Sequence, residues 1–237
     1  MEIRIYNNPI EVAEKFAEYL SELISAKNGP VHIALSGGST PKLLFSHLST
    51  NYKKIDWNQV HLYWGDERCV PPTDKESNYK MTTETLLSHI HIPSANIHRV
   101  LGENDPETEA LRYSEEIKKT VPDANGLPRF DLVMLGMGDD GHTASIFPHQ
   151  IELLESDKIC AIGTNPQSGQ KRVTITGKVI NNAACVVFLV TGSSKTEKVF
   201  EVHKKEKDYK KYPASYINPS NGNLIWFMDK DAARLIS

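Results

Sequence analysis

A glycine-rich segment, GMGDDGHTASIFP at residues 136–148, carries the side chains best suited to acid–base chemistry. It follows an apolar run at residues 131–135, and its glycines permit an irregular backbone after a strand. His142 lies two residues after Asp140, a spacing that lets the carboxylate approach the imidazole. Imidazole exchanges protons near neutral pH, and a carboxylate beside it fixes its orientation. We therefore predict that His142 is a general base oriented by Asp140; a helix-capping or core histidine is the alternative.

A second glycine-containing segment, SGGSTP at residues 36–41, separates an apolar run at 31–35 from a helical pattern that begins at Lys42. Adjacent glycines let the backbone approach a ligand, and the start of a helix offers free N–H groups and the positive end of the helix dipole. For this segment alone, a strand-to-helix turn without a ligand is an equally good interpretation. The residues that would form a phosphate cradle are Ser36, Gly37, Gly38, Ser39 and Thr40.

A third segment, WGDERCVPP at residues 64–72, also leaves an apolar run, at 60–64. Ligands of open α/β sheets bind in the crevice at the carboxyl ends of the strands, so we expect Asp66, Glu67 and Arg68 to face that crevice. An arginine there is able to hold a phosphate through two N–H groups. The alternative is an ordinary cluster of surface ion pairs, which these residues alone favour modestly.

The sequence lacks the motifs of several other kinds of active site. There is no G-x-S-x-G nucleophile elbow, no H-E-x-x-H zinc motif and no G-x-x-x-x-G-K-[ST] phosphate loop. His89 and His91 make half of a metal site that no nearby ligand set completes, so we expect a surface segment and no metal. Cys69, Cys160 and Cys185 fit neither an even disulfide framework nor a C-x-x-C pattern and are expected to be free thiols.

The composition, with 39% hydrophobic and 24% charged residues, is typical of a folded globular protein. The first residues, MEIRIYNN, are too polar for a signal peptide, and no apolar run is long enough to span a bilayer, which favours a cytoplasmic protein. A net charge of −3 argues against a nucleic-acid partner. The basic run HKKEKDYKK at residues 203–211 includes acidic residues, and we interpret it as a solvated helix end and loop.

Short apolar runs alternate with amphipathic helical patterns, which predicts an α/β fold with a mostly parallel sheet and helices on both faces. The clearest helix follows Pro9, stops at residues 27–29, and repeats apolar residues at helical spacing. Strands are expected at residues 31–35, 60–64, 96–101, 130–135, 172–176, 184–190 and 224–228. The chain has 237 residues and no internal repeat, so we expect a single α/β domain over residues 1–237.

Taken together, SGGSTP, WGDER with its following PP and SN, and GMGDDGHTASIFP resemble the three signature segments of the 6-phosphogluconolactonase family, in the family's order. The resemblance continues through residues 171–176, 191–195, 213–215 and 219–229 and covers nearly the whole chain. It implies a Rossmann-like sheet shared with glucosamine-6-phosphate isomerase/deaminase, and no cofactor. It also implies hydrolysis of 6-phospho-D-glucono-1,5-lactone to 6-phospho-D-gluconate, a step of the pentose phosphate pathway.

Carried over to this chain, the resemblance makes His142 the general base and Asp140 its orienter. Asp66 faces the same crevice, and the groups around the phosphate and sugar hydroxyls are Ser36 to Thr40, Arg68, Arg172 and Lys195. The expected partner is therefore a small sugar-phosphate lactone, with no nucleic acid and no membrane. The resemblance implies nothing about the oligomeric state.

Two other functions compete with this one. The related deaminases have a similar Asp-Gly-His loop in which a glutamate that assists ring opening stands five residues after the histidine; here that residue is Phe147. Losing the carboxylate removes a proton-transfer group that the deaminase reaction needs, whereas lactone hydrolysis needs one base and a water. A sugar-phosphate sensor on the same fold is a second alternative, which turnover would distinguish from binding alone.

Overall fold

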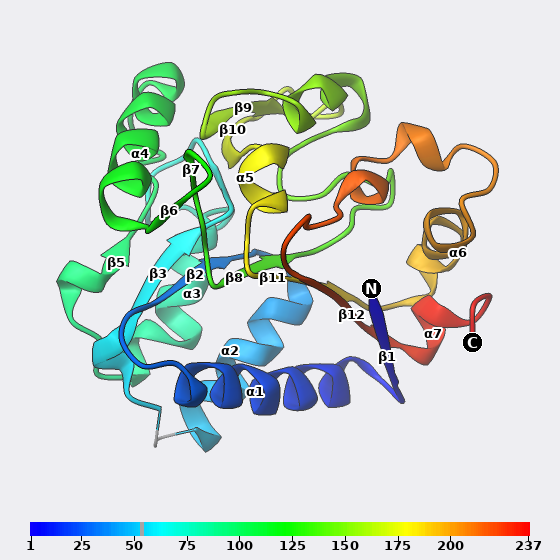
Figure 1. The fold of residues 1–237 in the computed structure, drawn as a ribbon, viewed down its shortest axis with the longest axis horizontal. Helices are drawn as coiled ribbons and strands as arrows, with labels where there is room; N and C mark the ends of the chain where they lie inside the picture. The colour runs from blue at the N-terminus through cyan, green and yellow to red at the C-terminus, as the bar shows by residue number, and fades with distance from the viewer. Residues whose placement is uncertain (53–54) are drawn as a thin grey trace.

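The computed structural model describes residues 1–52 and 55–237 and is built around a seven-stranded sheet in the order β1-β12-β11-β8-β2-β3-β5 (Figure 1). Each neighbouring pair of strands runs parallel, so the predicted α/β fold is confirmed. The strands are β1 (Glu2–Tyr6), β2 (Val31–Leu35), β3 (Val60–Trp64), β5 (Ile97–His98), β8 (Leu132–Leu135), β11 (Cys185–Val190) and β12 (Asn223–Asp229).

Helices cover both faces of this sheet, as a buried parallel sheet requires. In Figure 1, α1 and α2 lie below the sheet and α4 and α5 lie above it. Helix α1 turns one apolar stripe inward, with Val12, Phe16 and Leu20 at most 2% exposed. The helices are α1 (Pro9–Ala26), α2 (Ser39–Asn51), α3 (Asn78–Thr85), α4 (Pro106–Thr120), α5 (Gly177–Asn181), α6 (Thr196–Lys204) and α7 (Lys230–Ala233).

A smaller antiparallel sheet, in the order β4-β10-β9, sits on the side of α4 and α5. It consists of β4 (Asp66–Arg68), β10 (Lys171–Ile175) and β9 (Cys160–Thr164). The strand expected at residues 172–176 is therefore real but belongs to this second sheet, because β10 pairs with the segment that follows β3. A short hairpin of β6 (Asp123–Ala124) and β7 (Leu127–Pro128) completes the strands.

The strand order reverses direction between β2 and β8. From β2 the chain proceeds outward through β3 to β5, whereas from β8 it proceeds the other way through β11 to β12. The loops that leave β2 and β8 therefore diverge and open a crevice at the carboxyl ends of these strands, which is where ligands of doubly wound sheets bind. Both predicted glycine loops, at residues 36–41 and 136–148, begin at this crevice.

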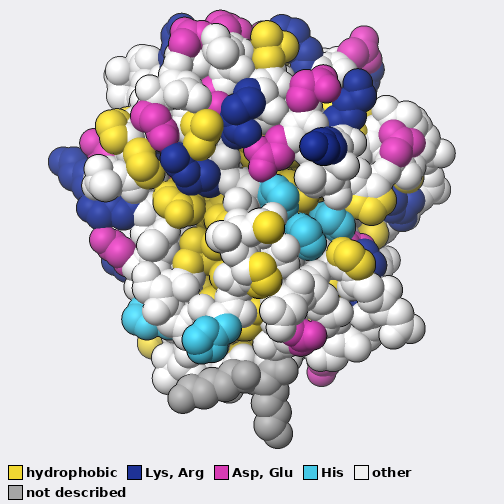
Figure 2. Space-filling model, turned by 90° about the vertical axis from the view of Figure 1, so that its left-hand side faces the viewer, with side chains coloured by type: hydrophobic (Ala, Val, Ile, Leu, Met, Phe, Trp, Pro, Cys, Tyr) yellow, Lys and Arg dark blue, Asp and Glu magenta, His cyan; other side chains and the backbone are white. Residues whose placement is uncertain are grey.

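Charged side chains of both signs are interspersed on the face of the molecule that Figure 2 shows. Lysine and arginine side chains alternate there with acidic ones and form no continuous basic surface. This mixture agrees with the net charge of −3. The absence of a nucleic-acid partner stays a prediction.

The basic run at residues 203–211 forms the end of α6 and a following loop, as predicted, but its first residue packs inward. The His203 ring stands edge-on to Trp226, with ring centroids 4.6 Å apart. Both ring nitrogens are buried and have no hydrogen-bond partner among the residues described. Burial lowers the pKa of His203 to about 4.

Replacing His203 by phenylalanine is expected to protect the protein against acid. An unfolded histidine binds a proton near pH 6.5 and the buried His203 only near pH 4, so the native protein loses stability as the pH falls through this window. The variant avoids this loss. The difference in unfolding free energy between the variant and the wild-type protein should therefore be about 2 kcal/mol more favourable to the variant at pH 5 than at pH 7.5. Urea unfolding at both pH values measures the difference, and an equal effect at both would contradict the buried, neutral state of His203.

Candidate active site

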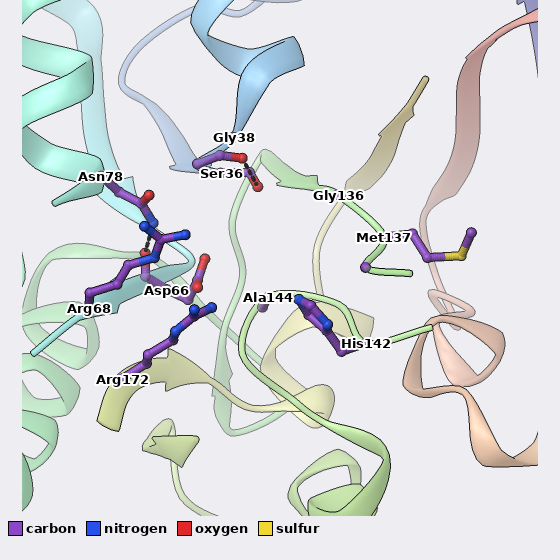
Figure 3. A pocket seen from close by; sticks show the side chains of 12 residues that line it. Ser36, Gly38, Asp66, Arg68, Asn78, Gly136, Met137, His142, Ala144 and Arg172 are labelled. Atoms are coloured by element: carbon purple, nitrogen blue, oxygen red, sulfur yellow. Dashed lines mark hydrogen bonds between the residues drawn. The ribbon is translucent and has the colours of Figure 1, made fainter. Parts of the chain in front are cut away.

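The crevice between β2 and β8 contains a pocket of about 190 Å³. In Figure 3, Asp66, Arg68 and Arg172 lie on one side of this pocket and His142 on the other. Seven of the residues predicted from the sequence line it, together with Asn78, Gly136, Met137, Gly138 and Ala144. The seven are Ser36, Gly37, Gly38, Asp66, Arg68, His142 and Arg172.

His142 and Asp140 form the pair that the sequence predicts. The Asp140 Oδ1 atom lies 2.5 Å from His142 Nδ1 and also accepts a hydrogen bond from the His142 backbone N–H at 3.0 Å. Burial raises the pKa of Asp140, but the hydrogen bond and charge of His142 outweigh it, so the pKa lies below its usual value and the carboxyl is ionised. An ionised carboxylate only accepts hydrogen bonds, so Nδ1 carries a proton and neutral His142 has its lone pair on Nε2.

Glycines allow the catalytic loop to fold back beside this imidazole. A Cβ atom on Gly138 would lie 2.1 Å from His142 Nδ1. Gly141 has φ of +81°, and a Cβ atom there would lie 2.6 Å from Tyr212. The Gly138 backbone N–H donates to the His142 carbonyl at 2.9 Å and closes the loop. A side chain at Gly138 would displace His142, and one at Gly141 would clash with Tyr212 and strain the backbone, which explains why the loop has glycine at both positions.

Phe147 packs directly against the His142 imidazole. Its ring is 1% exposed, and its centroid lies 4.7 Å from that of His142. The guanidinium carbon of Arg172 lies 5.6 Å from the centre of the Phe147 ring on the pocket side. The residue at the position of the expected deaminase glutamate is therefore a buried aromatic side chain that packs on His142.

Asp66 and Arg172 are joined through a buried serine. Ser145 donates from Oγ to Asp66 Oδ2 at 2.6 Å, and Arg172 Nη1 donates to the same Ser145 oxygen at 3.5 Å. Burial lowers the pKa of Arg172, and the nearby Asp66 charge opposes this effect. Asp66 is only 6% exposed and lines the pocket, so the hydrogen bond from Ser145 fixes a carboxylate, a hydrogen-bond acceptor, in the pocket wall.

The expectation that Glu67 faces the crevice is wrong. Glu67 is 2% exposed, points away from the pocket, and accepts hydrogen bonds from the backbone N–H groups of Asn78 and Tyr79 at the start of α3. Strand alternation sends it to the opposite side from Asp66 and Arg68. Burial raises the pKa of Glu67, and the hydrogen bonds that its carboxylate accepts from backbone N–H groups oppose this effect. Its role is to fasten the loop to α3.

Arg68 has donor capacity that no protein group uses. Its Nη1 donates to the Glu76 carbonyl at 2.5 Å, whereas its buried Nε has no partner among the residues described. Arg68 lines the pocket and forms no ion pair with the other described residues, so its guanidinium charge suits an anionic or oxygen-rich ligand there. This favours a ligand role for Arg68 over the surface ion-pair alternative.

Sequence reasoning named Asn78 as part of a motif but gave it no role in the site. Asn78 is 3% exposed, donates from Nδ2 to the Asp66 carbonyl at 3.0 Å and lines the pocket. A Cβ atom on Gly37 would lie 1.9 Å from Asn78 Oδ1, so the glycine of one loop makes room for the asparagine of another. The SN that follows WGDER was the signal that could have identified it.

Three of the other predicted residues line an adjoining pocket, whereas Asp140 lines neither pocket and reaches the site through His142. Ser39, Thr40 and Lys195 line the adjoining pocket, which shares Gly37, Gly38, Gly136 and Met137 with the first pocket. Thr40 and Thr191 are linked by a 2.8 Å hydrogen bond between their hydroxyl groups. Because the two pockets share these residues, we describe them together as one cleft, which His142 lines in the first pocket and Lys195 in the second.

Comparison with known proteins agrees with this geometry. The family model for glucosamine-6-phosphate isomerases/6-phosphogluconolactonase matches residues 8–226. The chain belongs to this family. A 6-phosphogluconolactonase of Haemophilus influenzae is 44% identical over 228 residues, which cover 95% of this chain and 94% of the relative. That of Treponema pallidum is 46% identical over 171 residues, covering 72% and 71%.

A solved structure of 6-phosphogluconolactonase from Trypanosoma brucei superposes with a TM-score of 0.90 at 28% identity, covering 100% of this chain and 98% of the other. The family and the enzyme class predicted from the three loops are thereby confirmed. Over the described part of the chain, no helix is both long and apolar enough to cross a membrane. Within the same residues, no group of three or more His, Cys, Asp or Glu side chains is arranged to hold a metal ion.

Proposed function

We propose that this chain hydrolyses 6-phospho-D-glucono-1,5-lactone to 6-phospho-D-gluconate with a water molecule that His142 activates. The observation that carries the proposal is the hydrogen bond between Asp140 and His142, which leaves His142 Nε2 as a proton acceptor in a pocket that also contains Arg68 and Arg172. The relatives of this chain support the same substrate. One domain over residues 1–237 and a cytoplasmic location remain part of the proposal.

The reaction needs one base and a means of holding the developing charge. His142 Nε2 takes a proton from water as the water oxygen attacks the lactone carbonyl carbon. Backbone N–H groups of the glycine loops are suited to stabilise the resulting oxyanion. The bond between the carbonyl carbon and the ring oxygen then breaks, and the imidazolium returns the proton to the leaving oxygen. Asp140 holds the imidazole in the orientation and tautomer that both proton transfers require.

The phosphate and the sugar hydroxyls occupy the rest of the cleft in this proposal. The backbone of residues 36–40 and the start of α2 provide N–H groups for the phosphate, because no side chain caps this helix. Three cations, Arg68, Arg172 and Lys195, line the same cleft. Asp66 accepts hydrogen bonds from sugar hydroxyls. Binding energy from these remote groups positions the carbonyl over His142.

Turnover of freshly prepared lactone tests the proposed function. Purified protein should release acid from 6-phosphogluconolactone faster than the lactone hydrolyses by itself, as a pH-stat measures. Binding of the lactone without faster acid release would instead indicate a sugar-phosphate sensor.

A second assay separates this reaction from that of the related deaminases. Because Phe147 provides no carboxylate for ring opening and packs on His142, we expect no release of ammonia from glucosamine 6-phosphate. A coupled ammonia assay at enzyme concentrations far above those used for the lactone measures this. Sustained, enzyme-dependent ammonia release would reverse the assignment.

A further inference from the structure

One ion pair at the cleft has no part in the mechanism so far. Asp139, which precedes Asp140 in the catalytic loop, accepts hydrogen bonds through Oδ1 from Lys195 Nζ at 2.6 Å and from Ser194 Oγ at 3.0 Å. Ser194 and Lys195 belong to a short helical turn, η5 (Ser193–Lys195), that follows β11. The pair therefore joins the loop after β8 to the segment after β11, beside the second pocket, which Lys195 lines.

The two partners differ in exposure. The Lys195 side chain is 19% exposed and that of Asp139 is 74% exposed. An ion pair with so exposed a member contributes little to stability, so its conformational effect matters more. The hydrogen bond from Lys195 keeps the pKa of Asp139 below its usual value, against the opposing effect of burial. Asp139 is accordingly a charged surface group whose hydrogen bond fixes the position of the Lys195 ammonium.

The backbone that carries Lys195 is fixed from the opposite side. The Gly192 N–H donates to both carboxylate oxygens of Asp229, at 3.0 and 2.9 Å. Thr196 Oγ1 contacts the carbonyls of Ser193 and Asp231, at 2.9 and 2.7 Å. These contacts set the position of the Lys195 Cα atom, but a lysine side chain has four further rotatable bonds. Asp139 restricts those bonds.

We propose that Asp139 is a positioning residue that holds the Lys195 ammonium at the wall of the second pocket, where it meets the substrate phosphate. The inference rests on the proposed function. Adjacent carboxylates of one loop then position two different side chains, Asp140 the His142 imidazole and Asp139 the Lys195 ammonium. An ammonium has three N–H donors, so the bond to Asp139 leaves two for a phosphate in the pocket that Lys195 shares with Ser39 and Thr40.

The negative charge of Asp139 has an opposing effect, because it repels a phosphate. Water screens that repulsion strongly at a side chain that is 74% exposed. Holding a flexible cation in its bound position, by contrast, removes an entropy cost that the ligand would otherwise meet. We therefore expect the positioning effect to exceed the repulsion.

Kinetics with two lactones test the inference. Asp139→Ala should lower kcat/KM for 6-phosphogluconolactone roughly tenfold, mainly through KM, and change that for unphosphorylated gluconolactone less than about twofold. Asp139→Asn, whose amide oxygen accepts the same hydrogen bond, should recover most of the loss. The double variant Asp139→Ala/Lys195→Ala should be no worse than Lys195→Ala alone, because both changes remove one interaction. Circular dichroism confirms the fold.

Asp157→Ala is the matched control. Asp157 forms a comparable ion pair with Lys178, with 2.5 Å between Oδ1 and Nζ, and its side chain is 95% exposed. This pair lies away from the cleft. This substitution should leave kcat/KM unchanged for both lactones. Equal losses of Asp139→Ala on both lactones, a gain on the phosphorylated one, or additive losses in the double variant would overturn the inference. If wild-type protein failed to hydrolyse the lactone, the proposed function would fail. The inference would then depend on whether Asp139→Ala weakens inorganic phosphate binding in calorimetry, and unchanged binding would overturn it.

Discussion

Arg68→Ala is expected to lower kcat/KM for 6-phosphogluconolactone roughly tenfold to a hundredfold and to change that for unphosphorylated gluconolactone much less. The size follows from a charge-assisted contact, which contributes about 1.5–3 kcal/mol. The structure provides the reason to choose Arg68, because its buried Nε has no partner among the described residues and its side chain lines the pocket of His142. Initial rates of acid release with both lactones measure the effect.

Arg129→Ala is a suitable control, since this arginine donates to the Asn221 carbonyl and does not line the cleft. It should leave both specificity constants unchanged. Equal losses of Arg68→Ala on the two lactones would assign Arg68 to the chemistry or to the structure of the loop. No loss on either would return Arg68 to the class of surface ion-pair residues. Arg68→Lys should recover part of the activity, because a lysine keeps the charge but not the two-pronged geometry.

The sequence predicts the centre of the sheet better than its edges. Strands β2 and β3 have the predicted bounds, because they are buried runs between clear turn residues. Strand β1 was missed although its alternation of polar and apolar residues is typical of a strand; it lies at an edge of the sheet, beside β12, and has no buried apolar run. The sheet to which β10 belongs could not be predicted either, because the pairing of β10 with β4 joins segments about a hundred residues apart in the chain.

In the site, contacts within one loop could be predicted from the sequence better than contacts between loops. Spacing within one loop predicted the contact between Asp140 and His142, which local geometry almost ensures. Contacts between loops were not predictable, such as the Ser145 hydroxyl that joins Asp66 to Arg172. The inward turn of Glu67 depends on α3, whose first N–H groups need an acceptor. A pattern in one loop carries no information about an acceptor that a distant helix requires.

His142→Ala should have the largest effect of all the substitutions, a loss of roughly a hundredfold or more in the rate on the phosphorylated lactone. His142 is the group in the pocket with a free proton-accepting nitrogen, and its removal leaves water without a positioned base. Asp140→Asn should still cost a large part of the rate, because the amide no longer enforces the Nδ1–H tautomer, but less than His142→Ala, because the imidazole remains. KM should change little in either variant, since neither group is assigned to the phosphate.

His91→Ala is the matched control for this substitution, because His91 is an exposed histidine that does not line the cleft. Its rate should equal that of the wild-type protein. Thermal unfolding of the variants distinguishes a lost base from a lost fold, and spontaneous hydrolysis of the lactone is subtracted from every rate.

The most direct test of the account is the initial rate of acid release from fresh 6-phosphogluconolactone by folded His142→Ala protein, compared with wild type in the same pH-stat. We predict that the variant retains at most about one hundredth of the wild-type rate while still binding 6-phosphogluconate. A folded variant with a rate close to that of wild type would contradict the assignment of His142 as the base that activates water.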